Sequence, residues 1–224
     1  MKRNKTYIQV AGLRTVKDAL LCVECGVDII GLLVGQMHTS DDFISKETAK
    51  QIKASLPKNI KTTLITHLEN ADEIIPLIRF IGVNYVQLHS NIAENEVQKI
   101  KNALPKIKLI RVIHILQDGK ILTKLDKIKY VDYFFTDSIN LSTNQVGGTG
   151  ITHNLETDKH LVETLTKPVF IAGGLTPENV RSAIEFCKPY GVDVNSGCRA
   201  KEGGRDRKKT QKFVDEVKKA NTTF

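Results

Sequence analysis

The chain repeats one pattern eight times: a short, nearly continuous apolar run is followed by a segment with apolar residues three to four positions apart. Runs of the first kind are typical of strands covered on both faces, because a strand with one solvated face alternates apolar with polar residues. The second spacing is that of an amphipathic helix. The expected strands cover residues 6–12, 27–34, 61–68, 84–89, 108–115, 131–137, 167–174 and 191–197.

Helical segments are expected between nearly all of these strands. They cover residues 15–25, 45–56, 70–81, 93–104, 121–128, 158–166, 176–187 and 206–220. Eight alternating strand–helix units in 224 residues predict an α/β fold, a single (β/α)8 TIM barrel over residues 1–224. An open doubly wound sheet is the alternative, but the eighth unit completes a barrel and no G-x-G-x-x-G motif opens the chain.

Composition restricts the expected partners. Hydrophobic residues make up 41% of the chain, and no stretch approaches the roughly 18 apolar residues of a membrane span, so we expect no membrane association and a cytoplasmic location. The formal net charge is +8, but the lysines are spread over helical segments and no aromatic residue is interleaved with them. Nucleic-acid binding is therefore not expected.

The four cysteines are expected to be packing residues. The C-x-x-C motif of Cys22 and Cys25 lies near the end of an expected helix. A redox pair would need a helix N-terminus, which lowers the pKa of a thiol. Cys187 and Cys198 are isolated in the sequence.

The ends of the seventh and eighth strands predict a phosphate site. In a TIM barrel the active site forms at the C-terminal ends of the strands, and a phosphate commonly binds after strands seven and eight. These strands end in "IAGGLTPENV" and "VDVNSG", where glycines let the backbone approach a ligand. The residues expected to bind phosphate are Gly173, Gly174, Asn195, Ser196 and Gly197.

The sixth strand carries an acidic residue to the same end of the barrel. Asp137 follows an apolar run, which places its carboxylate beside the expected phosphate site. A polar loop, "INLSTNQVGGTG", comes next, and its length and glycines are typical of a segment that closes over a substrate.

Six motifs in order along the chain carry a family resemblance: "GLRTVKDAL", "CGVDIIGLLV", "VQLH", "TDS" with "GGTG", "IAGGLTPENV", and "GVDVNSG" with "GGRD". Together they resemble the phosphoribosylanthranilate isomerases, barrel enzymes of tryptophan biosynthesis. The resemblance implies an Amadori rearrangement of an aminoaldose phosphate to an aminoketose phosphate. An acid protonates the furanose ring oxygen, and a base removes the C2 proton.

The resemblance also implies roles for individual residues. Asp137 matches the family's acid, and the loops that hold the phosphate match residues 173–174 and 196–197. The "GGTG" loop matches residues 147–150, so Gly148 and Gly150 are expected to contact the substrate.

Two family positions differ in this chain. The family's base is a cysteine at the end of strand one, where this chain has Ala11, which cannot accept a proton. The family's arginine for the anthranilate carboxylate falls at or near Asp42, and one carboxylate repels another. We therefore expect another base, His67 or His89, and an aglycone other than anthranilate.

Histidines stand at or just after the ends of strands two to five. These are His38, His67, His89 and His114, and with Asp137 they form a possible divalent-metal site. The alternatives are new acid–base groups and single ligand contacts or structural roles. No other cofactor is expected.

Three functions follow from these observations. The first is proton-transfer isomerisation of a phosphorylated sugar or sugar-amine by an aldose–ketose isomerase. The second is a metal-assisted phosphosugar epimerase or aldolase. The third is a non-catalytic barrel that binds a phosphorylated metabolite. In each case the partner is a phosphorylated small molecule, and the chain is expected to be a monomer or a homodimer.

Overall fold

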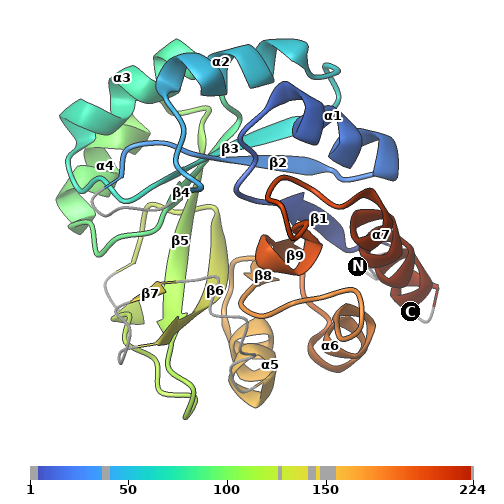
Figure 1. Ribbon diagram of the computed structural model, residues 1–224. Helices are drawn as coiled ribbons and strands as arrows, with labels where there is room; N and C mark the ends of the chain where they lie inside the picture. Colours follow the sequence, from blue (N-terminus) through green and yellow to red (C-terminus); the bar gives the residue numbers. More distant parts are fainter. Residues whose placement is uncertain (1–4, 37–40, 126–127, 141–144, 147–154, 223–224) are drawn as a thin grey trace.

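The computed structural model describes residues 5–36, 41–125, 128–140, 145–146 and 155–222, which fold as a closed parallel barrel ringed by helices (Figure 1). Each strand pairs in parallel with the next in the order β1-β2-β3-β4-β5-β6-β8-β9, and β9 pairs with β1 to close the sheet. The barrel strands are β1 (Tyr7–Val10), β2 (Ile29–Leu33), β3 (Lys61–Thr66), β4 (Tyr85–Leu88), β5 (Lys108–Ile115), β6 (Tyr133–Asn140), β8 (Val169–Ile171) and β9 (Gly191–Val194). A short strand, β7 (Gln145–Val146), pairs antiparallel with β6.

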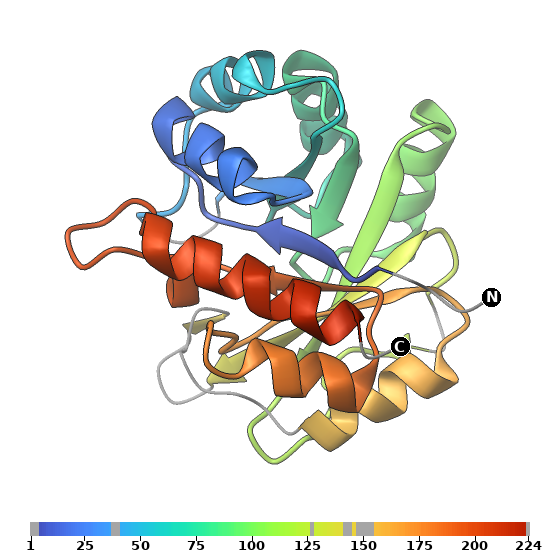
Figure 2. The same ribbon diagram turned by 90° about the vertical axis from the view of Figure 1, so that its right-hand side faces the viewer.

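Helices cover the outside of the barrel. They are α1 (Val16–Cys25), α2 (Lys46–Ser55), α3 (Ala71–Ile81), α4 (Glu94–Ala103), α5 (Leu155–Thr164), α6 (Val180–Cys187) and α7 (Arg207–Asn221). In Figure 2, α7 lies between α1 and α6, so the C-terminal helix covers the seam where β9 meets β1. The predicted TIM barrel is confirmed.

Local capping explains why most helix positions were predictable. Four helices begin where a side-chain oxygen accepts a backbone N–H of the first turn; these caps are Thr15, Ser45, Asn70 and Asp206. Two helices end at a glycine in the left-handed region, Gly26 and Gly82. The helix expected at 176–187 starts only at Val180, because Thr176 N donates to Asn179 Oδ1 at 2.8 Å and forms a turn first.

The helix predicted over residues 121–128 is wrong for the described part of that range. Ile115 at the end of β5 forms an antiparallel bridge with Ile121, and Leu122 N donates to the His114 carbonyl at 2.9 Å. These amide groups pair back onto β5 in a hairpin and are therefore not available for helical hydrogen bonds. Between β5 and β6, the described residues form no α-helix.

The barrel interior is layered. Side chains at alternate strand positions point inward, and those toward the N-terminal end of the strands form a layer rich in aromatic residues, called the aromatic layer below. It consists of Tyr7, Ile29, Tyr85, Ile110, Val112, Tyr133, Phe135, Phe170 and Tyr190. Above it lies a buried polar layer in which Gln9 Nε2 donates to Gln87 Oε1 at 3.1 Å and Thr63 Oγ1 donates to Gln9 Oε1 at 2.8 Å. This polar layer forms the floor beneath the strand ends.

The cysteines are buried and free, as predicted. Burial raises the pKa of Cys22, Cys187 and Cys198 to about 12, so these thiols stay protonated at neutral pH. Among the helices that the structure describes, none has the length and apolar character needed to cross a membrane.

Gly191 permits the close packing of β9 against the aromatic layer. A Cβ atom added there would lie 2.1 Å from Phe170 Cε1 and 2.8 Å from the Tyr7 carbonyl oxygen. We expect Gly191→Ala to lower the free energy of unfolding by about 3 kcal/mol, because the added methyl group overpacks the interior and the backbone of β9 must shift to accommodate it.

Gly82→Ala is the matched control for this prediction. Gly82 has a φ of +76° but nothing within 4 Å of an added Cβ atom, so only the backbone strain of about 1 kcal/mol applies. Urea unfolding of both variants measures the difference. Equal losses of stability would contradict the packing described for Gly191.

Candidate active site

The strand ends bring a histidine and an aspartate into contact. His89 follows β4 and Asp137 lies in β6, two strands away around the barrel. His89 Nε2 and Asp137 Oδ2 lie 3.2 Å apart, a hydrogen-bond distance, and Asp137 Oδ1 accepts a hydrogen bond from Ser138 N at 2.8 Å. Both carboxylate oxygens of Asp137 are therefore engaged. His89 is buried, and it joins Asp137 in one hydrogen-bonded pair.

The histidines form a row of rings along β3, β4 and β5. The His67 and His89 rings stack with centroids 4.8 Å apart and an interplanar angle of 4°, and the centroid of His114 lies 5.4 Å from that of His89. Burial lowers the pKa of His114 to about 4, and the neighbouring His89 adds to this, so His114 is neutral at neutral pH. The structure thus brings these three residues together at the strand ends.

The row does not have the geometry of a metal site. The described residues contain no group of three histidine, cysteine, aspartate or glutamate side chains that could hold a metal ion. Stacked imidazoles present their faces to one another, whereas metal ligands direct nitrogen lone pairs at one point. His38 lies outside the described residues.

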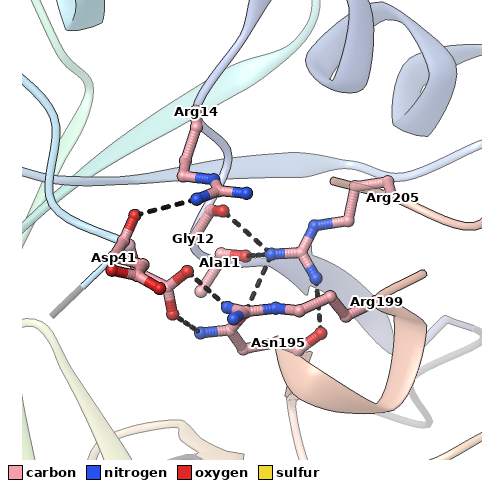
Figure 3. Close-up of polar contacts among 8 residues, drawn as sticks. Ala11, Gly12, Arg14, Asp41, Asn195, Arg199 and Arg205 are labelled. Atoms are coloured by element: carbon pink, nitrogen blue, oxygen red, sulfur yellow. Dashed lines mark hydrogen bonds and ion pairs between the residues drawn. The ribbon is translucent and has the colours of Figure 1, made fainter. Parts of the chain in front are cut away.

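Arg205 holds the end of β1, where the family base is expected (Figure 3). Its Nη2 donates to the carbonyls of Ala11 and Gly12 and to Asn195 Oδ1, and its Nη1 donates to the Asn195 carbonyl. Arg205 is 7% exposed. The last residue of the predicted strand is therefore fixed through its backbone, and the Ala11 side chain takes no part in this clamp.

Asp42 is paired rather than free. Its Oδ1 forms an ion pair with Arg199, and its Oδ2 accepts a hydrogen bond from Asn195 Nδ2 at 2.8 Å. Arg14 reaches the same corner, where its Nη1 lies 3.4 Å from the Asp41 carbonyl oxygen (Figure 3). The expected repulsion of a substrate carboxylate assumed an unpaired Asp42, and the Arg199 cation now offsets that charge.

The two glycine loops predicted to bind phosphate lie against one another. Gly173 and Gly174 have φ values of +86° and +69°, in the region that favours glycine. A Cβ atom added at Gly197 would lie 2.1 Å from the Leu175 carbonyl oxygen, so the loops after β8 and β9 are in contact. Ser196 is exposed beside them.

The other residues expected to bind the phosphate or the substrate are Asn195, Gly148 and Gly150. The Asn195 side chain is directed away from these loops toward Arg205 and Asp42. Gly148 and Gly150 lie outside the described residues.

Asp193 is a candidate site residue that no sequence motif had singled out. It faces the barrel interior from β9, and although part of the residue is accessible, its Oδ1 is buried without a hydrogen-bond partner. Burial raises the pKa of Asp193 to about 7, the Asp137 charge adds to this rise, and a hydrogen bond from Gln9 opposes it. The available signal was an acidic residue inside the apolar run "GVDV", where a charge is rarely buried without a role.

Arg205 was missed for a different reason. In the sequence it stands in "GGRDRKK", among charges that look like a solvated surface. Arg207, two residues later, is such a surface charge and pairs with Glu24. No local pattern separates the buried arginine from its exposed neighbour.

Fold and site together define a TIM barrel with a histidine–aspartate pair and two glycine loops at the C-terminal face of the strands. The family model described as N-(5′-phosphoribosyl)anthranilate (PRA) isomerase matches residues 8–216. The chain belongs to the phosphoribosylanthranilate isomerase family, a family of barrel isomerases, as its motifs predicted.

Individual relatives match over nearly their whole length. The N-(5′-phosphoribosyl)anthranilate isomerase 2 of Methanosarcina mazei is 39% identical over 211 residues, which cover 94% of this chain and 93% of that protein. The isomerase of Aquifex aeolicus is 33% identical and covers 94% and 98%. The crystal structure of the Thermotoga maritima isomerase superposes with a TM-score of 0.83 at 26% identity, covering 96% and 99%.

The Arg205 clamp predicts a large stability loss on its removal. We expect Arg205→Met to lower the free energy of unfolding by about 3–5 kcal/mol, because buried carbonyl oxygens at Ala11 and Asn195 lose their donor. Arg181→Met is the control: Arg181 pairs with Glu185 on the exposed face of α6 and should change stability by less than about 0.5 kcal/mol. Chemical denaturation measures both, and similar small effects would contradict the clamp.

Proposed function

We propose that this chain is an aldose–ketose isomerase that converts a phosphorylated sugar-amine by proton transfer. The observation that carries the proposal is the His89–Asp137 pair, whose atoms lie 3.2 Å apart at the C-terminal ends of the strands. A histidine and a carboxylate in contact form a proton-transfer group that works near neutral pH. The family membership supports the same reaction class.

The His89–Asp137 pair would begin the reaction. A proton from this pair goes to the furanose ring oxygen, the bond between that oxygen and C1 breaks, and the nitrogen lone pair forms an iminium ion. Loss of the C2 proton then moves the C2–H electron pair into a C1=C2 bond and the iminium π electrons back to nitrogen. The resulting enaminol becomes the ketose by transfer of protons alone.

His67 would act beside this pair rather than in place of it. Its ring stacks on His89 and also meets Phe43 edge to face, with centroids 5.4 Å apart. Such packing fixes the plane of the His89 ring, which favours a positioning role for His67 over the role of base. The role of His67 as the base stays a prediction.

The contacting glycine loops support a phosphate site. Residues 173–174 and 196–197 would present backbone amides to the phosphate, as barrels commonly do after their last strands. The phosphate would anchor the substrate at β8 and β9, so the sugar carbons extend across the barrel toward His89 and Asp137.

The aglycone is the open part of the proposal. The relatives' names make N-(5′-phosphoribosyl)anthranilate the first substrate to test. Asp42 in the place of the family's arginine favours an aglycone without a carboxylate, but the Arg199 ion pair weakens that argument. A different aglycone therefore stays a prediction.

Other predictions also remain open. No contact among the described residues favours a metal-assisted epimerase or aldolase over the isomerase, and a non-catalytic barrel is excluded only by measured turnover. The cytoplasmic location stays a prediction. So does the monomeric or homodimeric state; a Thermotoga maritima isomerase is described both as a dimer and as monomers generated from it.

Two substrates distinguish an aglycone with a carboxylate from one without it. N-(5′-phosphoribosyl)anthranilate and the corresponding aniline compound, which lacks the carboxylate, are offered to the purified protein and the ketose phosphate is followed by NMR. We expect turnover of both, with kcat/KM about tenfold higher for the aniline compound because Asp42 stands in the place of the family's arginine. A preference for anthranilate would overturn only the aglycone prediction, whereas no turnover of either would overturn the isomerase proposal.

Variants of the proton-transfer pair test its role. His89→Gln and Asp137→Asn should each lower kcat by roughly 10²- to 10⁴-fold, because each removes half of one acid–base unit. The double variant should lose little more than either single variant, as residues acting as a unit are not additive. The control is His160→Gln on the exposed face of α5, with kcat unchanged. Fully additive losses would mean that His89 and Asp137 act separately.

A further inference from the structure

We propose that Asp193 is the base that removes the C2 proton, in place of the cysteine that Ala11 replaces. This inference rests on the proposed isomerase function and assigns the second proton transfer of that reaction. It also replaces the expectation of a histidine base, since His89 is committed to Asp137 by their hydrogen bond.

Asp193 lies beside the position of the lost base. Strands β1 and β9 pair in parallel, with Gln9 opposite Asp193, and Ala11 N donates to the Val194 carbonyl at 3.0 Å. Because strand side chains alternate, Asp193 and Ala11 both face the barrel interior from adjacent strands. The Asp193 carboxylate on β9 therefore lies on the same side of the site as a side chain at the end of β1.

The carboxylate of Asp193 is incompletely satisfied. Its Oδ1 is buried and has no hydrogen-bond partner among the residues that the structure describes. Asp132, at the opposite end of the barrel, shows the usual alternative: its carboxylate accepts hydrogen bonds from Lys101, Lys108 and Leu109 N. A buried carboxylate oxygen without a donor is costly, so it is expected where a substrate completes the contact.

The charges around Asp193 suit a base that works near neutral pH. Burial is the main cause of its raised pKa of about 7, and Asp137 raises it further. The groups that oppose the rise are the Gln9 amide on β1, His89 at the end of β4 and the Arg205 guanidinium. A base with a pKa near the working pH can both take up the C2 proton and release it.

The two carboxylates stand on different walls of the site. Asp137 on β6 is held by two hydrogen bonds, whereas Asp193 on β9 has an unpartnered oxygen. Strand β8 runs between them and continues into Ala172 and Gly173. Two carboxyl groups in such unlike environments are suited to different roles in one proton-transfer reaction.

The proposed step is balanced without any further reactant. One oxygen of Asp193 takes the C2 proton of the iminium intermediate, the C2–H electron pair forms the C1=C2 bond, and the iminium nitrogen becomes neutral. The protonated Asp193 then returns this proton to C1 of the enaminol. The C2 hydroxyl group loses its proton to solvent as the C2 carbonyl forms, and solvent restores the proton that the His89–Asp137 pair gave to the ring oxygen. No group is oxidised or reduced apart from the internal exchange between C1 and C2.

The test removes only the acid–base capacity of Asp193. Asp193→Asn keeps the size of the side chain and should lower kcat roughly 10²- to 10⁴-fold. It should also abolish exchange of the C2 deuteron of labelled substrate with water. The probe is whichever of the anthranilate and aniline phosphoribosylamines the wild-type protein converts. Asp215→Asn on the outer helix α7 is the matched control, with kcat and exchange unchanged.

The pH profile supplies an independent readout. A base must be deprotonated to act, so wild-type kcat should fall as the pH drops below about 7, and Asp193→Asn should lose this limb. Formate added to Asp193→Ala should restore part of the rate by filling the vacated space. An unchanged kcat and pH profile in Asp193→Asn would overturn the assignment while leaving the isomerase proposal intact.

A titration covers the case in which neither substrate is converted. The ¹³C signal of the Asp193 carboxyl group, identified by its absence in Asp193→Asn, should titrate near neutral pH in the wild-type protein. A midpoint at the ordinary aspartate value of about 4 would overturn the inference whatever the activity. A midpoint near 7 without turnover of either phosphoribosylamine would support the base and contradict the proposed substrate class.

Discussion

The pairing of β9 with β1 is the constraint on which the rest of the structure depends. It closes the sheet, and closure forces alternate side chains of every strand into a shared interior. The interior is then filled in order, with an aromatic layer, a polar layer of Gln9, Thr63 and Gln87, and the His89–Asp137 pair above. Arg205 strengthens the same seam because it binds carbonyls from both strand ends.

Most of the architecture could be predicted because it is encoded locally. Each barrel strand overlaps an expected apolar run, and caps such as Ser45 and Gly82 mark helix ends within the sequence itself. The failure after β5 has a local cause that periodicity does not reveal. Residues 121–125 contain helix-like spacing, but a hairpin with the end of β5 uses the amide of Leu122 first.

The candidate site was predictable as a set of strand ends, but not as a set of contacts. Parallel strands deliver His67, His89 and Asp137 to one face, and this follows from topology alone. Which of them touch depends on strand order and ring orientation: His89 meets Asp137 through its edge and His67 through its face. The pairing of Asp42 with Arg199 joins residues 157 positions apart, so no local pattern signals it.

The Arg205 clamp separates the position of the strand end from the chemistry of the side chain at residue 11. Because Arg205 grips the carbonyl oxygens of Ala11 and Gly12, the strand end keeps its place whatever side chain stands at position 11. The backbone at this strand end is fixed by Arg205, and the side chain at position 11 can change without moving it. Chemistry can then be lost, gained or moved to a neighbouring strand in a descendant of this barrel without a new solution to the folding problem.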